Sequence, residues 1–326
     1  MQEAPVKVLL VGVDIGEEAD FEYSMEELAS LAEAAEKEVV GQIVQRLDHV
    51  NKALYIGTGK VDDVRRLAEE RGAQEVVFDN SLTPSQVRNL GKELELTVID
   101  RTNLILDIFA IRAQTREAKL QVETARLQYM LPRLVGMYDA LSRQGGASGS
   151  MSNKGTGEKK LELDRRKIEH RITELKKELE DVSRTRDVQR RKRQQSRTPQ
   201  VALVGYTNSG KSAIMNSLLS LTERDDKLVK SEDMLFATLD TKHRKIAVEQ
   251  GCEFILIDTV GFVSKLPHGL VEAFKSTLEE VKDADLLIHT VDSSYENRDF
   301  QIEVTNKVID ELGAGGKRKI MAYNKM

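Results

Sequence analysis

The stretch VALVGYTNSGKS at residues 201–212 decides how the chain folds. Its first four residues are apolar and predict a buried strand, and residues 205–212 match G-x-x-x-x-G-K-[ST] at each fixed position. The apolar spacing of residues 213–221 predicts a helix directly afterwards. In a strand–loop–helix unit of this kind, backbone N–H groups and the helix N-terminus surround a phosphate. The pattern therefore predicts a nucleoside-phosphate site rather than a chance glycine-rich turn.

Different residues of this loop are expected to bind different parts of the nucleotide and its metal ion. We expect Lys211 to reach the β- and γ-phosphates and the Ser212 hydroxyl to ligate Mg²⁺. The predicted nucleotide contacts within the loop and the first turn of the helix are Gly205, Tyr206, Thr207, Asn208, Ser209, Gly210, Lys211, Ser212 and Ala213.

Downstream segments supply further groups in an order that suits the same site. Phe236 and Thr238 lie in the polar segment FATLDT, where a mobile loop would approach the γ-phosphate. The strand EFILID ends in Asp258, which can hold Mg²⁺, and Gly261 then offers a backbone N–H to the γ-phosphate. The predicted catalytic residues are Lys211, Thr238 and Gly261, and the predicted metal ligands are Ser212, Thr238 and Asp258.

Composition indicates a protein of two or three domains that works inside the cell. The chain has 326 residues and a single cysteine, which excludes an internal disulfide framework and suits a reducing compartment. Its five histidines show no metal-ligand spacing. No apolar run approaches the roughly 18 residues of a membrane span, and the N-terminus lacks a signal-peptide pattern. We therefore expect a cytoplasmic protein with no membrane span.

Residues 1–110 alternate strand-like and helix-like segments, which predicts an N-terminal parallel α/β domain. A helix is expected over residues 24–35, with Ser24 as its N-cap and Glu27 three residues later. The run YIGTGK at 55–60 resembles a second phosphate loop but lacks the spacing. A turn that caps the next helix is the preferred interpretation.

Residues 111–198 predict an antiparallel helical hairpin around a glycine-rich loop at 145–157. Pro132 is expected to kink or restart the first helix. The second helix carries apolar residues at coiled-coil spacing: Leu161, Ile168, Ile172, Leu175, Leu179 and Val182.

Basic residues are concentrated on the second helix of this hairpin. Residues 159–197 contain 15 Lys/Arg and 8 Asp/Glu, or 15 − 8 = +7, in a chain of net charge −5. A solvated helix face explains the acid-laced part but not the run Arg190–Arg193, which has no acidic neighbour. That run predicts contact with a phosphate backbone, and the lack of aromatic residues favours structured RNA over single strands.

With these motifs in place, the chain resembles the HflX-type GTPases, in the Obg–HflX group of the translation-factor class of P-loop GTPases. The resemblance rests on GYTNSGKS, FATLD, DTVGF and LPHGLVEAFKSTLEE, and also on YIGTGK, FDNSLTPSQ, TGEKKLELDRR and the run IDRTNLILDIFAIRAQTREAKLQVETARLQYMLPRL from residue 99. It implies a GTP- and GDP-binding, Mg²⁺-dependent GTPase that binds the large (50S) ribosomal subunit and its rRNA to split or rescue ribosomes. We expect it to be monomeric.

Two positions depart from the pattern of Ras-like proteins. Phe262 stands where those proteins place a water-orienting glutamine, so slow hydrolysis that a partner accelerates is expected. Guanine is read by Asn-Lys-x-Asp, but the chain stops at Met326, directly after Asn324 and Lys325. We expect a truncated chain whose P-loop (Ras-like) GTPase domain, residues 199–326, is incomplete and lacks its C-terminal strand and helix.

Other functions are compatible with the same residues. The chain could be a ribosome- or RNA-binding protein whose nucleotide site is weak or non-catalytic, or an NTPase that accepts ATP as well as GTP. Asn208 lies three residues before Lys211. In several P-loop GTPases without the glutamine, an asparagine at this position helps to hold K⁺, so K⁺-stimulated hydrolysis is a further hypothesis.

Overall fold

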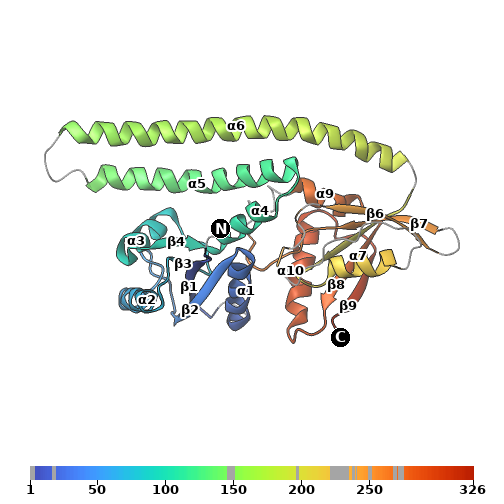
Figure 1. The fold of residues 1–326 in the computed structure, drawn as a ribbon, viewed down its shortest axis with the longest axis horizontal. Helices are drawn as coiled ribbons and strands as arrows, with labels where there is room; N and C mark the ends of the chain where they lie inside the picture. Colours follow the sequence, from blue (N-terminus) through green and yellow to red (C-terminus); the bar gives the residue numbers. More distant parts are fainter. Residues whose placement is uncertain are drawn as a thin grey trace. The chain divides into compact units, whose positions relative to one another are not determined.

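The computed structural model describes residues 4–16, 20–144, 151–195, 198–220, 235–236, 239, 241–248, 252–266, 270 and 275–326. The chain divides into two compact units, one made of Met1–Ile108 with Glu123–Lys177 and the other of Phe109–Val122 with Glu178–Met326. Each unit contains one β-sheet with helices packed against it (Figure 1). This arrangement confirms the predicted α/β class.

The sheet of the first unit has four parallel strands in the order β2-β1-β3-β4. The strands are β1 (Val6–Asp14), β2 (Lys37–Arg46), β3 (Glu75–Phe78) and β4 (Thr97–Asp100), and the helices that alternate with them are α1 (Phe21–Ala34), α2 (Thr58–Arg71), α3 (Pro84–Leu94) and α4 (Arg101–Arg112). Parallel strands need crossover helices, so this alternation in sequence leads directly to the observed sheet.

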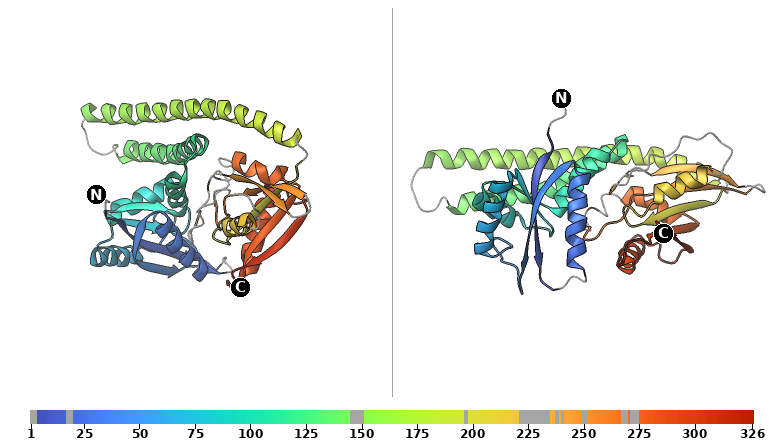
Figure 2. Two further views of the ribbon diagram at one scale, coloured as in Figure 1. Left: turned by 45° about the vertical axis from the view of Figure 1, so that its right-hand side comes forward. Right: turned by 60° about the horizontal axis from the view of Figure 1, so that its bottom comes forward.

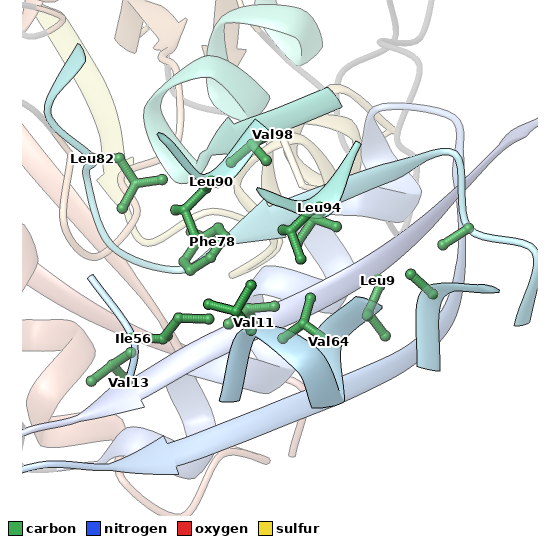
Figure 3. Close-up of a cluster of buried hydrophobic side chains, with 14 residues drawn as sticks. Leu9, Val11, Val13, Ile56, Val64, Phe78, Leu82, Leu90, Leu94 and Val98 are labelled. Carbon is green, nitrogen blue, oxygen red and sulfur yellow. The ribbon is translucent and has the colours of Figure 1, made fainter. Parts of the chain in front are cut away.

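A core of branched aliphatic side chains holds this unit together. Leu9, Val11 and Val13 of β1 meet Val64 of α2 and Phe78 of β3, all with exposures of 1% or less (Figure 3). Residues 8–11 of β1 are fully buried in succession, as expected for a parallel strand that is covered on both faces.

The start of α1 differs from the sequence-based expectation. The helix begins at Phe21, and its cap is Asp20, whose carboxylate accepts a hydrogen bond from the backbone N–H of Tyr23 at 3.0 Å. Ser24 therefore lies one turn inside the helix, and its predicted role as the cap is wrong. Its hydroxyl instead donates to Oδ2 of Asp79 at 2.8 Å. The glycine-rich run at 55–60 leads into α2 with Gly57 as the N-cap, as the turn interpretation predicted.

The helical hairpin consists of α5 (Arg116–Gln144) and α6 (Met151–Gln195), which run side by side in both figures (Figures 1 and 2). Arg116 pairs with Glu178 at 3.2 Å, and Glu123 pairs with Arg171 at 2.9 Å. From the first pair to the second, the position on α5 increases by seven residues while the position on α6 decreases by seven. The two helices therefore run antiparallel.

Three details of the hairpin bear on the predictions. The helix α5 continues through Pro132 without restarting, contrary to one of the two expected effects. The predicted glycine-rich loop at 145–157 is too long, because residues 151–157 belong to α6, while residues 145–150 lie outside the described part of the chain. On the predicted seam, Ile172 and Leu175 are buried.

The second unit is built on a five-stranded sheet in the order β6-β7-β5-β8-β9, in which only the pairing of β6 with β7 is antiparallel. The strands are β5 (Gln200–Gly205), β6 (Lys242–Val248), β7 (Cys252–Asp258), β8 (Leu286–Asp292) and β9 (Lys319–Asn324), and the described helices of this sheet are α7 (Lys211–Ser220), α9 (Lys275–Asp283) and α10 (Arg298–Glu311). The central strand β5 is buried at all of its positions. Met215 and Leu219 of α7 pack on its residues Val201 and Leu203, which fixes the loop between them.

Within the described ranges, no helix is both long enough and apolar enough to serve as a membrane span.

Candidate nucleotide-binding site

The phosphate loop joins the carboxyl end of β5 to the N-terminus of α7. Gly205 has a φ of 150° and Gly210 a φ of 91°, which residues with a Cβ rarely adopt. A Cβ at Gly205 would overlap the carbonyl oxygen of Thr290, and one at Gly210 would overlap Nδ2 of Asn324. Both glycines of the motif are therefore required by the close approach of neighbouring chain segments.

Lys211, the first residue of α7, turns its ammonium group back over the loop. Its Nζ donates to the carbonyl oxygens of Gly205 at 3.2 Å and Tyr206 at 2.8 Å. Burial lowers the pKa of Lys211 to about 8, and the nearby carboxylate of Asp258 only partly opposes this effect. A buried cation that donates to two carbonyl oxygens is well placed to gain from an arriving phosphate.

Ser212 and Asp258 come together although they are 46 residues apart in sequence. The Ser212 hydroxyl donates to Oδ2 of Asp258 at 2.7 Å, and the carboxylate of Asp258 is fully buried at the end of β7. A hydroxyl oxygen beside a carboxylate oxygen is the donor set that Mg²⁺ takes when phosphates and water complete its shell. The residues therefore fit a magnesium ion.

Gly261 passes close to the phosphate loop. A Cβ at this position would lie 2.5 Å from Cα of Thr207 and 3.0 Å from Nζ of Lys211. The next residue, Phe262, is 1% exposed. Its side chain is thus directed into the protein interior and supplies no polar group to the phosphate site.

The last predicted contacts lie at the end of β9. Nδ2 of Asn324 donates to the carbonyl oxygen of Ser209 at 3.0 Å, which ties the end of β9 to the phosphate loop. Nζ of Lys325 lies 3.0 Å from Oδ2 of Asp292 at the end of β8. The structure therefore brings Asn324 and Lys325 to the same edge of the sheet as the loop.

The remaining predicted residues have different outcomes. The backbone N–H of Phe236 donates to Oγ1 of Thr207 at 2.8 Å, which places this segment against the loop. Ser209 is buried, Asn208 has a left-handed φ of 58°, and Ala213 is exposed on the first turn of α7. Thr238, predicted as a catalytic residue and a metal ligand, lies outside the described residues.

Comparison with known proteins matches nearly all of this chain. Three family models cover it in succession: a GTP-binding GTPase N-terminal region at residues 22–110, a GTP-binding GTPase middle region at 112–193 and a 50S ribosome-binding GTPase at 200–325. The GTPase HflX of Caldanaerobacter subterraneus is 48% identical over 305 residues, which are 94% of this chain and 69% of that protein. The GTPase HflX of Escherichia coli is 39% identical over 99% of this chain and 74% of that protein.

The chain belongs to the HflX family of GTPases. Its relatives are GTP hydrolases, and the similarity extends over almost the whole chain. The resemblance inferred from the motifs is therefore confirmed. Among solved structures, a GTP-binding protein of Sulfolobus solfataricus in complex with GDP is 27% identical, with a TM-score of 0.52 over 98% of this chain and 82% of that one. This likeness supports a GDP- and GTP-binding site in the second unit.

Two residues of the site were not predicted from the HflX-type motifs. Ser264 donates its backbone N–H to the phenol oxygen of Tyr206 at 2.7 Å, and Asp292 pairs with Lys325. Asp292 is the last residue of β8, so an acid at a strand end was a usable signal. No signal marks Ser264, because its contribution comes from the backbone.

Proposed function

We propose that this chain is a GTPase that couples nucleotide hydrolysis to binding of the large ribosomal subunit, and thereby splits or rescues ribosomes. The observation that carries the nucleotide half is the cluster of Lys211, Ser212, Asp258 and Gly261 at one end of β5 and β7. The ribosomal half is supported by the match of residues 200–325 to a 50S ribosome-binding GTPase and by the basic helix α6.

The predicted catalytic residues, metal ligands and base-side residues have separate roles in this proposal. Lys211 binds the β- and γ-phosphates, and Gly261 offers its N–H to the γ-phosphate. Ser212, Asp258 and Thr238 hold Mg²⁺, with Asp258 acting directly or through water, and Thr238 also closes over the γ-phosphate. When bound, Mg²⁺ neutralises charge that develops on the phosphate oxygens. Asn324 and Lys325 line the base side of the site.

The nucleotide half is tested by removing single groups from the phosphate site. Lys211→Ala should weaken GTP and GDP binding at least a hundredfold, because the buried cation of the loop is lost. Ser212→Ala should weaken binding in the presence of Mg²⁺ and change it little in EDTA. Ser217→Ala, an exposed serine on α7, is the matched control. If Lys211→Ala bound GTP like the parent chain, the site assignment would be wrong.

The ribosomal half is tested by steady-state turnover with and without 50S subunits. We expect the subunits to accelerate GTP hydrolysis, since Phe262 cannot orient the attacking water as a glutamine does. Equal turnover with and without subunits would contradict the coupling. The same assay with ATP separates a GTPase from a broader NTPase, because the phosphate and Mg²⁺ contacts do not distinguish the bases.

A further inference from the structure

Two short segments lie against the phosphate loop, and hydrogen bonds from the loop hold both of them. The first is residues 261–264, which follow β7, and the second contains Leu235 and Phe236. In sequence, the first includes Gly261 and the second precedes Thr238, the two groups assigned to the γ-phosphate above. The hydrogen bonds described below hold both segments beside the loop.

The backbone of Phe262 forms a short ladder with the loop. Its N–H donates to the carbonyl oxygen of Gly205 at 3.2 Å, and its carbonyl oxygen accepts from the N–H of Thr207 at 2.6 Å. Tyr206 thus pairs with Phe262 as an isolated parallel bridge. The side chain of Phe262 faces away from solvent, so the contribution of this residue to the site is made by its backbone alone.

The side chain of Tyr206 extends this ladder by two residues. Its phenol oxygen accepts the backbone N–H of Ser264 at 2.7 Å, and the two residues are only 2% and 5% exposed. A buried N–H that loses its partner retains its desolvation penalty, so this bond strongly favours the observed path of the segment. Tyrosine is well suited to the task, because its ring spans the gap while its hydroxyl remains an acceptor.

The side chain of the next residue, Thr207, makes an equivalent hydrogen bond to the second segment. Oγ1 of Thr207, which is 5% exposed, accepts the backbone N–H of Phe236 at 2.8 Å. The second and third positions of the G-x-x-x-x-G-K-[ST] motif therefore each carry a hydroxyl that accepts from one of the two segments.

We propose that Tyr206 and Thr207 are positioning residues for GTP hydrolysis, which hold the two γ-phosphate segments against the phosphate loop. They keep Gly261 beside Nζ of Lys211, where its amide can meet the γ-phosphate. The inference rests on the proposed function, because it assumes that GTP occupies this site.

The test compares affinities for GDP and for a non-hydrolysable GTP analogue, together with the single-turnover rate of GTP hydrolysis. Tyr206→Phe removes only the hydroxyl and leaves the N–H of Ser264 without this acceptor. We expect about a fivefold to tenfold loss in analogue affinity and in the hydrolysis rate. GDP affinity should stay within about twofold, because GDP lacks the phosphate that these segments contact.

Variants of Thr207 that nearly keep its shape sharpen the test. Thr207→Val keeps the shape but removes the acceptor and should show the same asymmetry between the analogue and GDP, whereas Thr207→Ser keeps the hydroxyl and should restore parent values. Tyr323→Phe, which removes an exposed phenol (51%) from the same domain, should change none of the three quantities. Parent-like behaviour of both Tyr206→Phe and Thr207→Val, or an equal loss for GDP and the analogue, would overturn the inference.

The parent chain and Lys211→Ala separate this failure from failure of the proposed function. If the parent binds both nucleotides and Lys211→Ala binds neither, the site assignment is supported. The results for the Tyr206 and Thr207 variants then test this inference independently of the proposed function. If the parent binds no nucleotide, or Lys211→Ala binds as well as the parent, the site assignment falls and this inference falls with it.

Discussion

At the scale of single residues, the protonation of Lys211 links nucleotide binding to pH. Burial lowers its pKa to about 8, whereas bound phosphates favour the charged ammonium and raise the pKa again. Below about pH 7 the side chain is charged in both states, and affinity should not depend on its titration. Above about pH 8, binding must take up a proton, so the affinity should fall by up to about tenfold per pH unit.

This pH dependence can be checked with GDP dissociation constants at pH 7, 8 and 9. Calorimetry at pH 8.5 in two buffers with different ionisation enthalpies measures the proton uptake directly. A flat affinity between pH 7 and 9 together with no proton uptake would show that the lysine is not the titrating group that nucleotide binding senses.

Asn208 leads to a second prediction at this scale. It adopts a left-handed backbone conformation in the loop, three residues before Lys211. We expect its side chain to help hold K⁺ beside the phosphates, so hydrolysis should be several-fold faster in KCl than in NaCl. Asn208→Ala should remove that difference. Equal rates of the parent protein in the two salts would exclude the role of K⁺.

At the scale of secondary-structure elements, a buried ionic cluster joins α1, α4 and the residue that follows β3 in the first unit. Nη1 of Arg101 lies 2.7 Å from Oδ1 of Asp79, and its Nη2 pairs with the carboxylate of Glu27. The three side chains are at most 2% exposed. Removing the cation from such a cluster leaves two acids buried without their main counter-charge.

Arg101→Met should therefore destabilise the first unit by about 3–5 kcal/mol. The measurement is urea unfolding, with hydrogen exchange of β3 and α4 to assign the transition to this unit. Arg46→Met is the control, because Arg46 is 83% exposed in its pair with Asp14 and should cost less than about 1 kcal/mol. Similar effects of the two substitutions would mean that the buried cluster contributes no more than a surface pair.

At the scale of the whole molecule, the hairpin combines length with concentrated charge. The helix α6 has 45 residues, or about 68 Å at 1.5 Å per residue. In its middle part, basic residues are paired: Arg166 lies 3.0 Å from Glu162, and Arg171 lies 2.9 Å from Glu123. The run at 190–193, by contrast, has no acid next to it in sequence.

Replacing Arg190, Arg191, Lys192 and Arg193 with Gln should weaken binding to 50S subunits at least tenfold at moderate salt. It should also flatten the dependence of affinity on salt, because phosphate contacts release counterions. The matched control replaces Arg165, Arg166, Lys167 and Arg171, which changes the net charge equally but removes residues with acidic partners. Equal losses of 50S affinity in the two variants would mean that net charge, and not the run at 190–193, determines binding.

The sequence alone determined those features of this protein that short contiguous segments encode. The phosphate loop is one example, because a buried strand, two glycines, a lysine and a helix start are all contained in residues 201–212. The parallel sheet of the first unit is another, since alternating strands and helices leave few other arrangements. The helical character of the hairpin likewise follows from its seven-residue repeat, whereas its register is known only from ion pairs such as Arg116–Glu178.

Tertiary structure decided the pairings between distant positions. Arg101 meets Glu27 across 74 residues, Tyr206 meets Ser264 across 58, and Ser24 bonds Asp79 across 55 instead of capping its helix. Local patterns cannot reveal these contacts, because a side chain or backbone group is chosen as a partner only after the fold has buried it and removed water. Burial makes an unpaired polar group costly, and that cost selects the partner.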